Sequence, residues 1–361
     1  MQGGVWCRCA DPQDAALVAT LEDALAETGG SASLLATGID GVPNPAGRRD
    51  ARQLIERHDL GVLVWIGGAL DLVILQAARD AGLATILANV DGRALDGLSG
   101  FFNRGRLRAA LSGVAGAFVA ESATGDLLRQ AGVPEAAIHS GAALEPPVEV
   151  LDYSERDRRE IAEALQSRPV WMATGVRAGD VAPLAAAQRQ AHRRAHRLLM
   201  VACPADPAEG PALGRAFADE AGLLAGRSSD DPIPQEAAGV HVADADGDLG
   251  LWLRLASVTF AGGTFDDRDA EDPFRIAALG SGLLHGPRTA PFGDRYARLA
   301  QAGATRHVDT WEGLGVAVED LLATDRVAVM VTAGWDVTSR GAQSALMICE
   351  TILSRLKERV A

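Results

Sequence analysis

The chain has 361 residues, more than a single hydrophobic core usually holds, which predicts two domains. Hydrophobic residues make up 48% and charged residues 23%, an ordinary globular composition that argues against a disordered, collagen-like or disulfide-scaffold protein. The net charge of −14, from 34 basic and 48 acidic residues, disfavours general binding to nucleic acid or to an anionic lipid surface. Lys357 is the only lysine, so a Walker-type phosphate loop and a pyridoxal Schiff base are excluded.

The four cysteines, Cys7, Cys9, Cys203 and Cys349, are too few and too scattered for a disulfide framework, which indicates a reducing compartment. Cys7 and Cys9 form a C-x-C pair, but without a second pair at zinc spacing we interpret them as strand residues rather than metal ligands. No apolar run reaches the roughly 18 to 20 residues of a membrane span, and the first residues lack a signal-peptide layout. We therefore expect a soluble, cytoplasmic protein without a transmembrane anchor.

Short apolar runs alternate with segments of helical periodicity along the whole chain, which is typical of parallel sheets covered by helices. The periodicity also predicts two helical segments that close the chain without a further strand. The expected strands lie at 5–9, 33–36, 61–66, 84–89, 117–121, 170–173, 198–202, 240–243, 258–261 and 282–285. The expected helices include 12–28, 51–58, 70–81, 123–131, 311–324 and 341–360.

A polar, proline-containing stretch at 144–157 interrupts this alternation and has the character of a linker. We therefore expect an N-terminal Rossmann-like α/β domain at 1–146, a linker at 147–157 and a C-terminal α/β domain with closing helices at 158–361. Proteins of this architecture bind ligands between their domains, at the carboxyl ends of the strands.

Two glycines, Gly262 and Gly263, directly follow the expected strand at 258–261. Glycines in this place let the backbone approach a ligand closely and offer amide groups to a phosphate. A tight turn without a ligand would use the same residues.

Two further patterns have both a functional and a structural interpretation. Five acidic residues between 266 and 272 could bind a divalent ion, but they lack calcium-loop spacing, and we favour a solvated surface loop. His192 and His196 have the spacing of zinc ligands on a helix, yet Arg193 and Arg194 between them would repel a cation. A solvated basic face is the better interpretation.

Four blocks of sequence follow one another in the second half. They are G-D-L-G-L at 247–251, A-S-V-T-F-A-G-G-T at 256–264, P-F-R-I-A-A-L-G at 273–280 and G-P-R-T at 286–289 with Phe292. In order and spacing they resemble the G-E-L-G-L, A-D-V-A-F-V-G-G-S, P-L-E-P-A-A-L-G and G-P-H-T-x-x-F blocks of the 3-deoxy-D-manno-octulosonic acid (Kdo) transferases of lipopolysaccharide synthesis. Fainter similarity at 171–180 and 5–14 extends the resemblance over nearly the whole chain.

The resemblance implies the GT-B fold, in which two Rossmann-like domains face a common cleft. It implies an inverting, metal-independent transfer of Kdo from CMP-Kdo to a lipid A precursor, with a nucleotide sugar as donor and no cofactor. The acceptor would be met at the cytoplasmic face of the inner membrane. The donor-binding residues implied by the resemblance are Gly179, Gly247, Asp248, Leu249, Gly262, Gly263, Thr264, Asp272 and Arg275.

Asp14 falls at the position of the family's catalytic glutamate, counted from Trp6. A carboxylate there would take the proton of the acceptor hydroxyl as it attacks the anomeric carbon. Alternatively, Asp14 is only an acidic residue in the first turn of a helix, where the macrodipole favours a negative charge.

Several family residues are replaced in this chain. Arg275 stands where the family has a glutamate that resembles a ribose-binding residue, Ala205 and Asp206 replace a basic pair, and Leu144 replaces a lysine. Each lost polar contact typically costs about 1 to 3 kcal/mol, so several together could abolish binding of the family's donor. A non-catalytic or re-purposed paralogue is therefore the alternative to a working glycosyltransferase. An epimerase of the related UDP-sugar fold is a third candidate, which the four blocks fit less well.

Overall fold

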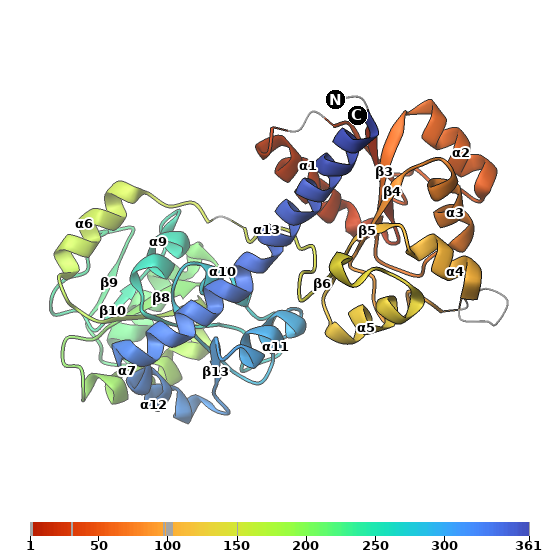
Figure 1. Ribbon diagram of the computed structural model, residues 1–361. Coiled ribbons are helices and arrows are strands. Elements are labelled where there is room, and N and C mark those ends of the chain that lie inside the picture. The colour runs from red at the N-terminus through yellow and green to blue at the C-terminus, as the bar shows by residue number, and fades with distance from the viewer. Residues whose placement is uncertain (1–2, 30–31, 97, 99–103, 150, 361) are drawn as a thin grey trace. The chain divides into compact units, whose positions relative to one another are not determined.

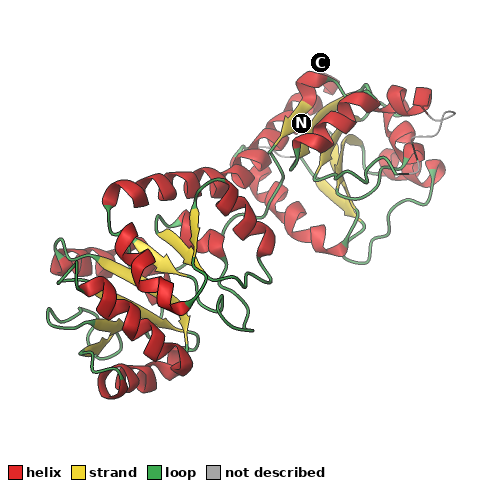
Figure 2. Ribbon diagram, turned by 90° about the horizontal axis from the view of Figure 1, so that it is seen from below, coloured by secondary structure: helices red, strands yellow, loops and turns green. Residues whose placement is uncertain are grey.

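The structure is a computed structural model of the chain and describes residues 3–29, 32–96, 98, 104–149 and 151–360. The chain divides into two compact units (Figure 1). The first unit comprises Met1–Pro147 together with Arg340–Ala361, and the second comprises Val148–Ser339. In each unit, helices surround a parallel sheet, as Figure 2 shows.

The first unit contains a six-stranded parallel sheet with the strand order β2-β1-β3-β4-β5-β6. All five expected strands form, and helices cover both faces of the sheet, so that every residue of β3 is buried. The additional strand β6 has only three residues, two of them polar, and carries no apolar run that would predict it. The strands are β1 (Gly4–Cys9), β2 (Leu34–Thr37), β3 (Leu60–Ile66), β4 (Ala84–Ala88), β5 (Val114–Val119) and β6 (Ile138–Ser140). The helices are η1 (Pro12–Asp14), α1 (Ala15–Glu27), α2 (Arg48–Arg57), α3 (Leu72–Asp80), α4 (Arg104–Leu111), α5 (Ser122–Ala131) and η2 (Glu135–Ala137).

The second unit contains a seven-stranded parallel sheet with the strand order β13-β12-β11-β7-β8-β10-β9. The five expected strands form here too. The two edge strands β9 and β13 are three residues long and only partly buried, which explains why no apolar run announces them. The strands are β7 (Val170–Val176), β8 (Leu199–Pro204), β9 (Ala225–Arg227), β10 (Val240–Val242), β11 (Val258–Phe260), β12 (Gly282–His285) and β13 (Thr305–His307). The helices are α6 (Glu155–Leu165), η3 (Ala178–Asp180), α7 (Val181–His192), η4 (Pro207–Glu209), α8 (Gly210–Arg215), η5 (Ala216–Glu220), α9 (Asp248–Leu255), α10 (Pro273–Ala278), α11 (Gly293–Gln301) and α12 (Trp311–Leu321).

The last helix, α13 (Thr324–Val360), is a single helix of 37 residues, longer than the segment expected at 341–360. The sequence places all of 158–361 in the second domain, whereas 340–361 belongs to the first unit. The reason is packing, because Ile348, Ile352 and Leu356 are buried in one cluster with Val5 and Val62 of the first sheet. The expected linker at 147–157 is shorter at its end, since α6 begins at Glu155, and its Val150 lies outside the described residues.

In each sheet, the first strand along the chain lies in the interior between two other strands. The strand order reverses at this first strand, which is called a switch point. β1 pairs with β2 and β3, and β7 pairs with β8 and β11, all in parallel. Ligands of open α/β sheets bind beyond the carboxyl ends of the strands at such switch points. The segments that follow β1 and β7 are therefore the places to look for a site in each unit.

We predict that Ile352→Ala destabilises the protein by about 2 to 5 kcal/mol, because it opens a cavity between α13 and the first sheet. Leu346→Ala on the same helix is the control. Leu346 is 40% exposed, so its truncation should change stability by no more than about 0.5 kcal/mol. Urea denaturation measures both values, and equal effects of the two substitutions would contradict the assignment of 340–361 to the first unit's core.

Candidate functional site

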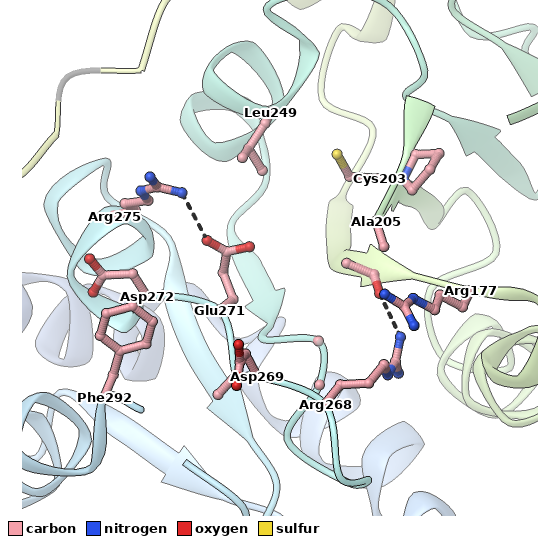
Figure 3. Close-up of a pocket in the computed structure, with 15 residues that line it drawn as sticks. Arg177, Cys203, Ala205, Leu249, Arg268, Asp269, Glu271, Asp272, Arg275 and Phe292 are labelled. Carbon is pink, nitrogen blue, oxygen red and sulfur yellow. Dashed lines mark hydrogen bonds and ion pairs between the residues drawn. The ribbon is translucent and has the colours of Figure 1, made fainter. Parts of the chain in front are cut away.

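A pocket of about 520 Å³ lies in the second unit at the switch point of its sheet (Figure 3). Residues at the ends of β7, β8 and β11 contribute to it, together with the start of α10. The loop at 266–272, which we call the acidic loop, contributes as well. This placement is the one expected for a ligand site in a parallel α/β sheet. The lining residues are Gly175, Arg177, Cys203, Pro204, Ala205, Leu249, Gly262, Gly263, Arg268, Asp269, Ala270, Glu271, Asp272, Arg275 and Phe292.

The turn at Gly262 and Gly263 forms one wall of this pocket, and both positions require glycine. A Cβ on Gly262 would lie 1.9 Å from the carbonyl oxygen of Thr174, and the Gly262 N–H donates to the Thr174 hydroxyl at 3.2 Å. Gly263 has φ +74, and a Cβ there would lie 2.3 Å from the carbonyl oxygen of Asp269. The glycines therefore let three backbone segments meet beside the pocket, which is a structural reason for them independent of any ligand.

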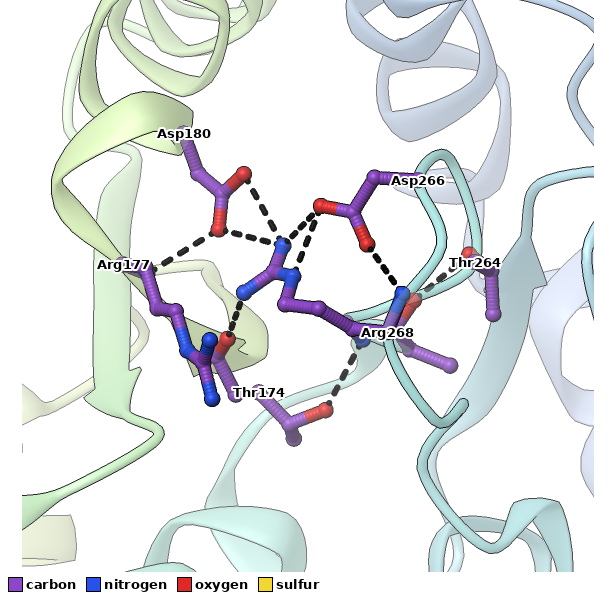
Figure 4. Close-up of polar contacts among 9 residues, drawn as sticks. Thr174, Arg177, Asp180, Thr264, Asp266 and Arg268 are labelled. Atoms are coloured by element: carbon purple, nitrogen blue, oxygen red, sulfur yellow. Dashed lines mark hydrogen bonds and ion pairs between the residues drawn. The ribbon is translucent and has the colours of Figure 1, made fainter.

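Arg268 joins the acidic loop to the strand and helix on the other side of the pocket (Figure 4). Its guanidinium donates to both carboxylate oxygens of Asp180, at 3.1 and 2.9 Å, and to the Gly175 carbonyl at 3.0 Å. It also donates to Asp266 at 2.7 Å, and this bond lowers the pKa of Asp266 and raises that of Arg268. Arg268 is thus committed to the protein and neutralised by two carboxylates.

Arg275 is neutralised in a similar way. Its guanidinium contacts Glu149 and lies 3.4 Å from a carboxylate oxygen of Glu271. Burial raises the pKa of Glu271. Asp272 accepts the Phe274 N–H at 3.0 Å and pairs with the Arg295 guanidinium, so it caps α10.

The acidic loop is therefore more ordered than the solvated loop that the sequence suggests. Asp266, Asp267, Glu271 and Asp272 each contact an arginine side chain, while Asp269 is exposed and forms no ion pair with the described residues. Across the described part of the chain, no cluster of three His, Cys, Asp or Glu side chains could hold a metal ion.

Five of the expected donor-binding residues line the pocket, and four do not. Gly179 is exposed in η3, and Gly247 is the left-handed N-cap of α9 with φ +80. Asp248 is buried and accepts the Ala245 N–H at 2.9 Å. Thr264 is fully buried; its hydroxyl donates to the Ala261 carbonyl and accepts the Gly286 N–H. The pocket-lining ones are Leu249, Gly262, Gly263, Asp272 and Arg275.

Asp14 belongs to the first unit and ends η1, shortly after the carboxyl end of β1. One of its carboxylate oxygens, Oδ2, accepts the N–H groups of Ala10 and Asp11, each at 3.0 Å. Asp14 is thus an acidic residue in the first turn of a helix, as the structural alternative has it, and it also completes a capping box with Asp11. The other oxygen, Oδ1, forms no hydrogen bond with the described residues, and the catalytic role of Asp14 stays a prediction.

Sequence reasoning missed two features of the pocket. Arg177 follows β7 and lines the pocket as an exposed side chain, with no carboxylate in ion-pair contact among the described residues. Cys203 lies at the end of β8, where burial raises the pKa of its thiol to about 12, so it is a neutral wall residue. The signal for Arg177 was its place directly after a buried strand at the switch point.

A second pocket of about 400 Å³ lies at the edge strand β9. His241 of the neighbouring strand is 1% exposed; its Nε2 is 2.9 Å from the Ser228 hydroxyl, and its Nδ1 is buried without a partner. Burial lowers the pKa of His241 to about 4. His241 is therefore neutral in the folded protein near pH 7.

No protein-family model matches the chain. Among solved structures, the UDP-GlcNAc 2-epimerase from Neisseria meningitidis bound to UDP-GlcNAc aligns with a TM-score of 0.52 and 11% identity, over 97% of this chain and 100% of that one. A glycosyltransferase from Rickettsia africae aligns with a TM-score of 0.47 and 10% identity, over 98% and 99%. The C-terminal CMP-Kdo binding domain of WaaA from Acinetobacter baumannii aligns with a TM-score of 0.47 and 18% identity, over 50% and 96%.

The chain therefore has an α/β fold of the GT-B type, with two Rossmann-like parallel sheets and alternating helices. At such low identity, the likeness concerns the fold alone. Of the helices that the structure describes, none combines the length and the apolar character needed to span a membrane.

Gly262→Ala should destabilise the protein by at least about 1 to 3 kcal/mol, because the new methyl group would overlap the Thr174 carbonyl. The matched control is Gly179→Ala, since a Cβ on Gly179 meets no atom within 4 Å. Thermal unfolding should show a clear loss for the first variant and a change within about 0.5 kcal/mol for the second. A Gly262→Ala protein as stable as the wild type would contradict the geometry of the turn.

The buried His241 also predicts a pH dependence of stability. The unfolded chain binds a proton below the ordinary histidine pKa of 6.5, whereas the folded chain does so only near 4, so stability is complete above pH 6.5 and falls as the pH approaches 4. The loss should reach about 2 kcal/mol at pH 5. Urea denaturation between pH 7 and pH 5 measures it. His241→Asn should flatten the slope and His58→Asn, an exposed histidine, should not; an unchanged slope in His241→Asn would refute the assignment.

Proposed function

We propose that the pocket of the second unit binds the nucleotide part of a sugar donor and that the chain is a glycosyltransferase. The observation that carries the proposal is the pocket of about 520 Å³ at the switch point of the sheet, which the turn at Gly262 and Gly263 borders. The Neisseria epimerase, which has the same fold, was crystallised with a nucleotide sugar, UDP-GlcNAc.

The charges of the pocket support a donor with a single phosphate. Arg268 and Arg275 are each neutralised by two carboxylates, which leaves Arg177 as the lining cation without an acidic partner in the described residues. One guanidinium can bind one phosphate group in a bidentate manner. A diphosphate would bring more negative charge beside Glu271 and Asp269 than Arg177 can offset.

The finer proposal is Kdo transfer from CMP-Kdo to a lipid A precursor at the cytoplasmic face of the inner membrane. It is supported by the four sequence blocks that resemble Kdo transferases and by the preference for a single phosphate. In this reaction, Asp14 takes the proton of the acceptor hydroxyl while the hydroxyl oxygen attacks the anomeric carbon. The bond from that carbon to the phosphate oxygen breaks, and CMP departs with its phosphate beside Arg177 and the glycine turn.

A second candidate is a non-catalytic or re-purposed paralogue of the same fold. The ion pairs of Arg275 with Glu149 and Glu271 favour it, because they occupy the position where the resembling family has a donor-binding carboxylate. Ala205, which lines the pocket, contributes no charge where that family has a basic residue. Nucleotide binding and transfer separate the two candidates.

Isothermal titration of the full chain with CMP should show binding, and Arg177→Ala should weaken it about tenfold, the usual effect of losing a hydrogen bond to a charged group. Arg193→Ala, an exposed arginine at the end of α7, is the control and should bind CMP like the wild type. UDP and UDP-GlcNAc serve as competing probes. Tighter binding of UDP-GlcNAc would favour the epimerase alternative, and binding of no nucleotide would defeat the donor site.

Transfer itself is tested with CMP-Kdo and a lipid A precursor. Asp14→Asn should abolish transfer while leaving CMP affinity unchanged, since Asp14 belongs to the other unit. A chain that binds CMP but transfers nothing with the wild-type sequence would establish the non-catalytic candidate.

A further inference from the structure

Arg8 occupies the carboxyl end of β1, at the switch point of the first sheet. It lies opposite Trp65 in the parallel pairing of β1 and β3, and its guanidinium carbon is 3.9 Å from the centroid of the indole ring. The indole N–H of Trp65 donates to the Gly67 carbonyl at 3.1 Å, which fixes the ring. The guanidinium therefore lies over a fixed aromatic ring before any ligand arrives.

No hydrogen bond joins the Arg8 guanidinium to a polar group of the described residues. Its Nη1 is buried without a hydrogen bond, and no carboxylate of the described residues forms an ion pair with it. Burial lowers the pKa of Arg8, while the charges of Asp71 and Asp14 raise it from a distance. Arg8 is half-buried, and its buried Nη1 is a charged donor without an acceptor, which costs free energy, so this position calls for an acceptor that the described residues do not supply.

The two nearby carboxylates are already engaged elsewhere. Asp71 accepts the N–H groups of Val73 and Ile74 and so caps α3. Asp14 uses one oxygen for the N–H groups that precede η1. Neither carboxylate can move to Arg8 without giving up these bonds, which explains why the guanidinium stays unpaired.

Two glycines lie at the same end of the first sheet as Arg8. Gly67 and Gly68 follow β3, both with φ +63. A Cβ on Gly68 would lie 2.6 Å from that of Ala10, and a Cβ on Gly67 would lie 3.7 Å from Oδ2 of Asp14. Glycine at these positions keeps the space next to Asp14 free of side chains, at the same end of the sheet as Arg8.

We propose that Arg8 binds an oxyanion of the acceptor, a carboxylate or a phosphate on a sugar, and thereby places a neighbouring hydroxyl at Asp14. That the bound sugar is the acceptor rests on the proposed glycosyl transfer, whereas the anion-binding site itself rests on Arg8 alone. A planar guanidinium binds either oxyanion in a bidentate manner. Asp14 and Asp71 limit the site to a group of low charge, because they repel a second negative charge.

The test uses three sugars with the full chain, in isothermal titrations. Glucuronate carries a carboxylate, glucose 6-phosphate a phosphate, and glucose neither. We expect the wild type to bind at least one of the charged sugars, and Arg8→Gln to weaken that binding at least tenfold without changing the response to glucose. Arg57→Gln, an exposed arginine at the end of α2, is the matched control and should behave like the wild type.

The comparison of the two charged sugars identifies the oxyanion. Tighter glucuronate binding indicates an acidic sugar as acceptor, and tighter glucose 6-phosphate binding indicates a phosphorylated one. Equal binding of all three sugars, no binding of either charged sugar, or binding that survives in Arg8→Gln would overturn the proposal.

Two further measurements guard against misfolding and separate this proposal from the donor site. Arg8→Lys keeps the charge but loses the planar fork, and it should bind the charged sugar at least threefold more weakly in a protein with unchanged thermal unfolding. Arg8→Gln should still bind CMP like the wild type. A wild-type protein that does not bind CMP would defeat the proposed donor site. The sugar titrations of the wild type and Arg8→Gln would still test the anion site on their own.

Discussion

The pocket of the second unit depends on the hydrogen bonds and ion pairs of the Arg268 guanidinium. The guanidinium holds the carbonyl of Gly175 in β7, the carboxylate of Asp180 in η3 and that of Asp266 in the acidic loop. Without this cation, the two carboxylates would face each other across a partly buried space and repel. These bonds hold the wall of the pocket together, and they also neutralise the positive charge that could otherwise bind a phosphate. A phosphate ligand would therefore compete with Asp180 and Asp266 for the same arginine.

The same compensation of charge explains what the residues that differ from the resembling family do in this pocket. A substitution such as glutamate to arginine at position 275 does not simply add a positive charge, because Glu149 and Glu271 compensate it. Burial also raises the pKa of Glu271 in the wall of the pocket, so this carboxyl group is a weaker acid than an exposed glutamate. The first unit contrasts with this arrangement, since Arg8 lies over Trp65 and no carboxylate of the described residues forms an ion pair with it.

The sequence predicted ten strands because each lies in an apolar run, the pattern expected in a parallel sheet whose two faces are covered. It missed β6, β9 and β13, whose three residues bury too little apolar surface to stand out. It also placed 340–361 in the wrong unit, because periodicity shows that a helix has an apolar face but not which sheet that face meets. In the pocket, Gly262 and Gly263 were visible as a pattern, whereas the roles of Arg177 and Arg268 depend on partners far away in the sequence.

The assignment of residues 340–361 to the first unit has a consequence for synthesis on the ribosome. The face of the first sheet that carries Val5 and Val62 is completed by Ile348 and Ile352 of α13. All of the second unit, Val148–Ser339, emerges before them. The first unit can therefore be completed only after the second unit has been translated, and until then its uncovered apolar face has to be kept from aggregating.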